Sequence, residues 1–498
     1  MKKVASLVLT MIIVMAVASV AFASGNIPGT GWWSGEQIQN VGTGTGTVTI
    51  TAYDAESPAT YDASKDIAAG ASATFIPSDF VGMPAGFQGS AVVSSNQDIR
   101  AIVNVTNRQV GDFGVAGGLA AAQYQGMNQG DTTINFPLAK NDYFNKTTTF
   151  YIQNAGTEAA TADATFFFGG TAYNYTTPAI GPGQMVIVTP ADATGAPSGD
   201  TDGVGSLTVV STQPLAGSVL EHSDDDATAK LLQATRGFVT TDGDTTLYAP
   251  IIKSVWFNRF TGLQVQNSSG SPVDIQVEYT GSGGACAGTT YNDSATGVGP
   301  GESHTFVHLP AQSPLPENCL ASATVTADGE ITAIVNESYT GAFVAAGNEQ
   351  ESTTYSAVPA NAETMIVSAP LFKENSYNKG TGLQVQNVGG SNASVTLTFT
   401  GATGTYVSTA QSIAPGASMT FVDVRLKPAS FWDGTAMTEA ALGCAPGCGS
   451  NGVFSVIVES NQPVVAIANE STYPFTAPAI AQDKNNYEGF NLTALPGQ

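Results

Sequence analysis

Histidine, the side chain most often used for acid–base chemistry and transition-metal binding, occurs only three times in the 498 residues. His304 and His308 fall in one strand-like run, where they would share a face about 13 Å apart, too far for one metal ion. His222 stands between Glu221 and Ser223, but neighbours in a strand point to opposite faces, so these three do not form a catalytic triad. No His-Glu-x-x-His, Gly-x-Ser-x-Gly or phosphate-loop motif occurs. We therefore expect no enzymatic activity.

Closely spaced carboxylates on turns are the second candidate site, because calcium prefers hard oxygen ligands. Three such clusters occur: Asp200 with Asp202, Asp224 to Asp226, and Asp242 with Asp244. None of them has the third ligand and distal Glu of a full calcium loop, so solvated turns are the alternative interpretation. Calcium bound there would stabilise the fold, and no other cofactor is expected.

The charge balance excludes several classes of partner. Lys and Arg number 16 against 40 Asp and Glu, for a formal charge of −24. Such a surface repels nucleic-acid phosphates and anionic lipid headgroups. We expect no nucleic-acid partner.

The first 23 residues have the pattern of a secretory signal peptide. Lys2 and Lys3 precede an apolar run that ends in Ala21-Phe22-Ala23, an A-x-A cleavage site. No later stretch approaches the roughly 18 apolar residues of a membrane span. The expected location is therefore secreted, extracellular or at the cell surface, without membrane insertion.

The elements that would hold these candidate sites repeat along the sequence. The chain contains four copies of one unit of about 115 residues. A strand-like run ends in Gln-Asn four times, and about 30 residues later a turn ends in glycine four times. The repeat-defining residues are Asn40, Asn154, Asn267 and Asn387, with Gly70, Gly183, Gly301 and Gly416. A Pro-led segment ending in Phe-Asn or Tyr-Asn precedes the last three Gln-Asn pairs, and a run such as Ala333-Ile-Val-Asn-Glu337 ends the unit.

Within a unit, apolar and polar residues alternate with the period of a half-buried strand. Leu263 and Val265 alternate with Gln264 and Gln266. About seven such strands, separated by turns, match a two-sheet antiparallel sandwich, and a barrel is the alternative.

The four cysteines lie in the third and fourth copies. In an exported chain, an even number indicates disulfides, and one bridge within each copy is the simplest of three connectivities. This pairing joins Cys286 with Cys319 and Cys444 with Cys448. A zinc site made of all four would require the two copies to touch.

The pattern resembles the bacterial extracellular immunoglobulin-like β-sandwich repeats of cell-surface proteins. Asn40-Val-Gly42, Asn154-Ala-Gly156 and Asn387-Val-Gly389 carry the resemblance together with the Pro-Gly turns, and repeat 3 departs from it at Asn267-Ser-Ser-Gly270. The resemblance implies a fold and no particular activity, because such modules serve as spacers, layer components, adhesins and carbohydrate-binding appendages.

We therefore expect an all-β chain of four tandem immunoglobulin-like antiparallel β-sandwich repeats in an elongated array. The expected divisions are a signal peptide (1–23), repeats 1 to 4 (24–135, 136–248, 249–368, 369–475) and a C-terminal partial repeat (476–498) that caps repeat 4 or pairs with another molecule. The expected role is a non-enzymatic structural or assembly component of a cell-surface layer, sheath or filament, with self-association or other surface components as partners. The alternative is an adhesin or carbohydrate-binding surface protein with a glycan partner.

Overall fold

The computed structural model describes residues 14–16, 27–107, 120–223, 231–340, 352–376, 379–444, 447–472 and 485–496. These ranges form antiparallel β-sheets with one short α-helix, α2 (Glu439–Leu442). Within them, no helix is long and apolar enough to cross a membrane. The prediction of an all-β chain is confirmed.

Repeat 2 shows the strand arrangement that recurs along the chain. Its long strand β14 (Val204–Ser223) belongs to two sheets, because its first half pairs with one set of neighbours and its second half with another. In the outer sheet lie β9 (Asp131–Lys140), β11 (Ala162–Phe168) and β12 (Thr171–Thr176). In the inner sheet lie β10 (Lys146–Asn154), β13 (Met185–Val188) and β15 (Leu232–Arg236), and the short β16 (Phe238–Val239) pairs with β9.

Repeats 3 and 4 follow the same order of strands. Repeat 3 consists of β17 (Asp244–Ser254), β18 (Arg259–Asn267), β19 (Val273–Gly284), β20 (Thr290–Val298), β21 (Ser303–Val307), β22 (Cys319–Tyr339), β23 (Thr353–Ser356) and β24 (Val358–Pro359). Repeat 4 consists of β25 (Thr364–Lys373), β26 (Lys379–Asn387), β27 (Ala393–Gly401), β28 (Gly404–Val407), β29 (Gln411–Ile413), β30 (Ser418–Phe421), β31 (Val453–Thr472), β32 (Asn485–Glu488) and β33 (Phe490–Leu492).

Repeat 1 is split where the others have one long strand. Its outer sheet has the order β1-β6-β3-β4 and its inner sheet the order β5-β2-β7-β8. The strands are β1 (Val14–Ala16), β2 (Trp33–Asn40), β3 (Gly46–Asp54), β4 (Thr60–Ile67), β5 (Ser72–Phe75), β6 (Gly89–Ser95), β7 (Ile99–Thr106) and β8 (Ala121–Gln125). Strand β1 falls inside the expected signal peptide and pairs with β6.

Each sandwich buries the apolar residues of alternating strands between its two sheets. In β3, Val48, Ile50 and Ala52 are fully buried, whereas the threonines between them face outward. On that outer face, Thr47 and Thr51 donate hydrogen bonds to carboxylates of β4. The period-2 pattern of the sequence therefore separates a buried face from a polar face.

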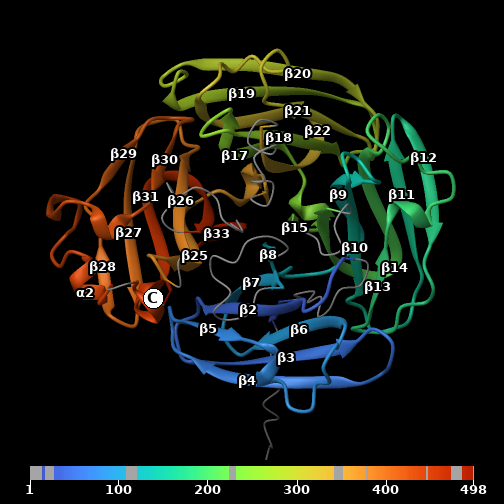
Figure 1. Cartoon of the computed structure of the whole chain (residues 1–498), viewed down its shortest axis with the longest axis horizontal. Coiled ribbons are helices and arrows are strands. Elements are labelled where there is room, and N and C mark those ends of the chain that lie inside the picture. Colours follow the sequence, from blue (N-terminus) through green and yellow to red (C-terminus); the bar gives the residue numbers. More distant parts are fainter. Residues whose placement is uncertain are drawn as a thin grey trace, which may run out of the picture.

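The four repeats close into a ring, and the expectation of an elongated array is wrong (Figure 1). Repeat 4 contacts repeat 1, because Ser455 bonds the carbonyl of Gly70, and Ile102 of β7 is buried in the apolar cluster of repeat 4. The inner strands β8, β15, β23 and β32 contact one another in sequence around the centre.

The C-terminal strands β32 and β33 complete repeat 4. They pair with β31 and β25, as β15 and β16 pair with β14 and β9 in repeat 2. The boundaries expected at 136, 249 and 369 fall inside β9, β17 and β25. The first strand of each unit therefore starts five residues earlier than the proline landmark indicates.

Short helical turns connect the strands. They are η1 (Pro77–Asp79), η2 (Pro190–Asp192), η3 (Thr240–Asp242), η4 (Ala360–Ala362), η5 (Val424–Leu426), η6 (Ala429–Phe431) and η7 (Gly449–Gly452).

Candidate functional site

The repeated asparagine makes the same three hydrogen bonds in every repeat. In repeat 1, the Asn40 amide donates to the carbonyls of Gly44 and Ile67, and its Oδ1 accepts the N–H of Gly42. The equivalent bonds form at Asn154, Asn267 and Asn387, at distances of 2.7 to 3.0 Å. A buried amide satisfied in this way ties the end of one strand to the turn some 30 residues later.

The glycine of that turn lies at a joint between repeats. All four glycines have a positive φ of 72° to 77°, and each donates its N–H to the carbonyl of the repeated asparagine. Each glycine carbonyl accepts a hydroxyl from the preceding repeat in the ring, at 2.5 to 3.4 Å. The donors to Gly183, Gly301, Gly416 and Gly70 are Ser90, Ser206, Ser322 and Ser455.

The four joints differ in how tightly the turn fits. A Cβ on Gly183 would lie 2.5 Å from the ring of Tyr53, and one on Gly301 would lie 2.4 Å from the ring of Phe167. The same atom on Gly70 would meet only Pro496, at 3.9 Å. The joint between repeats 4 and 1, which we call the closing joint, is therefore the most open of the four at its turn.

Further contacts hold the closing joint. Ser72 donates to the carbonyl of Pro370, and Ser368 bonds the side chain of Gln39. At the centre, Gln125 donates to the carbonyl of Glu488 at 2.7 Å. Buried and polar contacts thus both connect the first and last repeats.

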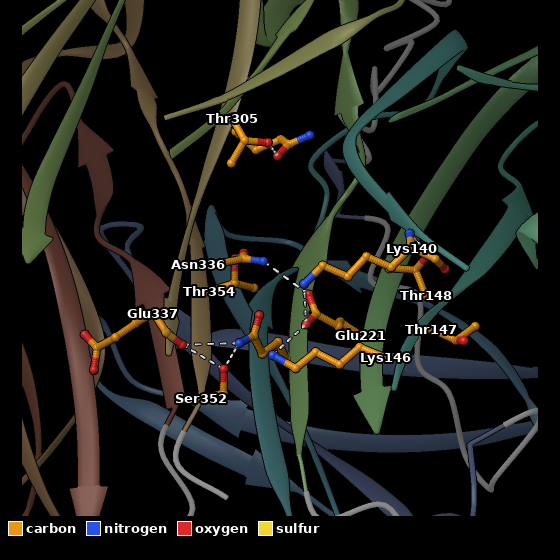
Figure 2. Close-up of polar contacts among 12 residues, drawn as sticks. Lys140, Lys146, Thr147, Thr148, Glu221, Thr305, Asn336, Glu337, Ser352 and Thr354 are labelled. Carbon is orange, nitrogen blue, oxygen red and sulfur yellow. Dashed lines mark hydrogen bonds and ion pairs between the residues drawn. The ribbon is translucent and has the colours of Figure 1, made fainter. Parts of the chain in front are cut away.

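Lysine–glutamate ion pairs flank the central strands, and Figure 2 shows the pair of repeat 2. Lys140 contacts Glu221 at 2.8 Å in repeat 2, and Lys373 contacts Glu470 at 2.7 Å in repeat 4. Repeat 3 has the same ion pair, between Lys253 and Glu337. The lysine ends the first strand of its repeat and the glutamate lies on the long strand, so each pair connects the two strands across the sandwich.

Charge and packing around Glu221 hold it ionised. Burial favours the neutral acid, but the ammonium groups of Lys140 and Lys146 reverse that effect and lower the pKa of Glu221 below its ordinary value. Glu221 also accepts a hydrogen bond from Asn336 of repeat 3 at 3.1 Å. The pair therefore joins two repeats as well as two strands.

Gln233 makes a second polar contact between repeats 2 and 3. Its side-chain amide donates to the Glu337 carbonyl at 3.3 Å and bonds the Ser352 hydroxyl. This arrangement holds ionised groups in fixed positions and brings no nucleophile to a base. These polar contacts hold repeats 2 and 3 together.

Repeat 1 lacks both members of the pair. Val105 occupies the position of Glu221, Glu337 and Glu470, and the lysine of the Pro-x-x-Lys segment has no counterpart before β2. The sequence analysis identified both the Pro-x-x-Lys segment and the run that ends in glutamate, but it did not predict the ion pair between them. Their joint presence in three repeats and joint loss in the first was the signal that could have revealed the contact.

Both cysteine bridges expected from the sequence are present, each within one repeat. Cys286 and Cys319 join β22 to the turn after β19, and Cys444 and Cys448 close a short loop beside α2. Disulfides of this kind indicate an oxidising compartment.

The acidic residues expected to bind calcium have other contacts. Asp242 forms a two-point ion pair with Arg236, and Asp244 accepts N–H groups from Thr246 and Asn361. Asp200 accepts the N–H of Phe144, and Asp202 lies on the exposed turn beside it. Asp224 to Asp226 lie outside the described residues. Within the described ranges, no group of three or more His, Cys, Asp or Glu side chains could hold a metal ion.

Two of the three histidines lie in the core. His308 is fully buried, with Nδ1 near Thr261 and Nε2 2.9 Å from the Tyr279 hydroxyl. Burial lowers its pKa to about 4. His222 is also buried and bonds Thr149. Both are core residues, not ligands.

A cavity of about 320 Å³ opens between the ends of repeats 1 and 2. Its walls include Gln125, Met127, Arg236 and Asp242. Because Arg236 is already paired with Asp242, the cavity offers no free cation to an anionic ligand.

No protein-family model matches the chain, and no curated protein matches it. Among solved structures, protein 1070 of Thermotoga maritima is 18% identical over 22% of this chain and 95% of its own, with a TM-score of 0.19. The serine-rich repeat adhesion glycoprotein of Streptococcus agalactiae is 9% identical over 53% of this chain and 89% of its own, with a TM-score of 0.13.

A Salmonella α-2-macroglobulin variant is 9% identical over 97% of this chain and 40% of its own, with a TM-score of 0.11. All three scores are too low to carry an argument about fold or function. The class that the structure defines is an all-β protein of several antiparallel sheets with two disulfides.

Proposed function

We propose that the protein is a secreted, non-enzymatic structural component of a cell-surface layer, sheath or filament, built as a ring of four immunoglobulin-like sandwiches. The observation that carries this proposal is the closure of the ring by the joint between repeats 4 and 1. A closed ring of interlocked modules is a rigid block, and its central contacts are occupied by its own strands.

Assembly of such rings would use the rim. The outer sheets end in β4, β12 and β20, which pair on one side only within the described residues. Repeat 4 differs, because Phe431 and Asp433 of its insertion bond Thr409 and Val407 beside β28. Free sheet edges are templates for pairing with another chain, and β12 carries no charged residue to prevent it.

Electron microscopy of the exported protein with and without calcium tests the proposal. We expect ordered sheets or filaments whose repeating unit is the ring. Asn174→Lys places a charge on the exposed face of β12 and should disrupt them. Thr405→Lys, on the covered edge of repeat 4, is the matched control and should leave them intact. Isolated rings at all concentrations would contradict a structural role.

An adhesin or carbohydrate-binding role is the second candidate, supported by two exposed aromatic residues. Phe144 and Phe257 are 59% and 73% exposed and occupy the same hairpin position in repeats 2 and 3. Both have a positive φ, a conformation that costs free energy for a bulky residue and recurs at functional sites. Binding on a glycan array that disappears with Phe144→Ala and Phe257→Ala would support this role.

A further inference from the structure

Among the described residues, repeat 1 has only the three residues of β1 at the edge where the other three repeats have a long first strand. In repeat 2, Ile134 of β9 lies opposite Val209 on the long strand. The same place in repeat 1, opposite Val93 of β6, is taken by Ala16 of β1. The equivalence follows from the outer sheets, where Ser90 and Ser206 pair with the same position of the neighbouring strand.

Only three described residues, Val14–Ala16, occupy this edge, whereas β9, β17 and β25 have ten or eleven. These three residues lie within the predicted signal peptide. If residues 1–23 are removed on export, the outer edge of β6 loses its partner strand.

A buried carboxylate faces the same gap. Glu36 is fully buried, and among the described residues no group other than its own backbone N–H bonds its carboxylate. Counted back from the repeated asparagine, its counterparts are Phe150, Leu263 and Leu383, all apolar. In repeat 2, Phe150 packs against Phe136 of β9, with ring centroids 5.0 Å apart.

Glu36 therefore points to the place where a complete first strand would bring its own core residue. Burial, together with the nearby charge of Asp79, raises the pKa of Glu36 to about 8. A carboxyl group in this setting needs a donor or a cation as its neighbour.

We propose that export exposes the edge of β6 and that an extended segment of a partner protein fills it, antiparallel to β6, with a lysine or arginine side chain facing Glu36. Main-chain hydrogen bonds would give the affinity and the ion pair the specificity. This inference goes beyond the structural role proposed above and stands whether or not rings assemble into a layer.

The partner is a different protein for two reasons. The first strands of repeats 2 to 4 and the C-terminal strands are already paired within their own repeats. A second exported copy would also be strongly acidic, with a formal charge of −26 once Lys2 and Lys3 are removed from the total of −24. A cationic segment of another protein has the complementary charge.

Peptide binding to the exported protein tests the inference, after mass spectrometry of its N-terminus. The probe is a peptide with the sequence of residues 131–140 carrying Phe136→Lys, and the unsubstituted peptide is its control. We expect the exported protein to bind the lysine peptide about tenfold more tightly, as a charge-assisted contact provides. Glu36→Leu should reverse this preference.

Glu36→Gln serves as a second variant, and it should reduce the preference while keeping the shape of the site. Equal affinity of the unaltered protein for both peptides, no binding of either, or an N-terminus that retains residues 1–23 would overturn the inference. Because assembly is followed separately by microscopy, failure here leaves the proposed structural role to its own test.

Discussion

Repeat 1 and repeats 2 to 4 share one fold but differ in how the sandwich is held together. Repeats 2 to 4 each have a long first strand and a buried lysine–glutamate pair, whereas repeat 1 has the three residues of β1, a valine at position 105 and a buried glutamate at position 36. A serine hydroxyl nevertheless bonds the carbonyl of the turn glycine at all four joints. Ring closure therefore depends on the joints, whereas the ion pairs connect strands within their own repeats, and Glu221 adds one contact to repeat 3.

Breaking one ion pair should have the largest effect. Lys253→Met leaves Glu337 buried, with Arg259 3.5 Å away as its remaining cation. We expect the unfolding free energy to fall by about 3 kcal/mol, because removing one partner of a buried ion pair is costly even though Arg259 remains near Glu337. Adding Glu337→Val, which copies Val105 of repeat 1, should recover most of that loss. Urea denaturation of both variants checks this, and a double variant as unstable as the single one would contradict it.

Replacing the turn glycine of a joint with alanine should rank the four joints by how tightly each turn fits against the neighbouring repeat. Every Gly→Ala change there costs about 1 kcal/mol because φ is positive. Gly301→Ala also clashes with Phe167, so we expect a further loss of about 1 to 2 kcal/mol, whereas Gly70→Ala meets open space. Thermal melting of the two variants measures the difference. Equal losses would show that the turn of repeat 3 does not dock on repeat 2.

The smallest effect should come from lowering the pH, through protonation of His308 in repeat 3. Repeat 1 has Pro77 at the equivalent position. Burial holds the pKa of His308 at about 4, below its ordinary 6.5. The unfolded chain therefore takes up the proton first, and stability is lost as the pH falls from about 6.5 towards 4. We expect this group to cost about 1 to 2 kcal/mol at pH 5. His308→Gln should flatten the melting temperature between pH 7 and 5, and an unchanged slope would argue against this cause.

Much of the fold could be predicted from the sequence because local residue patterns determine it. The Gln-Asn strand end, the glycine turn and the alternation in strands such as β3 recur at fixed spacing, and the cysteines fall in pairs within repeats. The ring could not be predicted, because the angle between modules depends on how Ser90 meets Gly183 across 93 residues. The burial of Glu36 was equally hidden, since one carboxylate in an alternating strand has no local mark.

Small-angle X-ray scattering of the exported protein is the most direct test of whether repeats 1 and 4 touch. A closed ring predicts a radius of gyration of roughly 25 Å, near that of a compact chain of this length. A radius of gyration roughly twice as large, with the scattering profile of a rod, would contradict ring closure and indicate an elongated array.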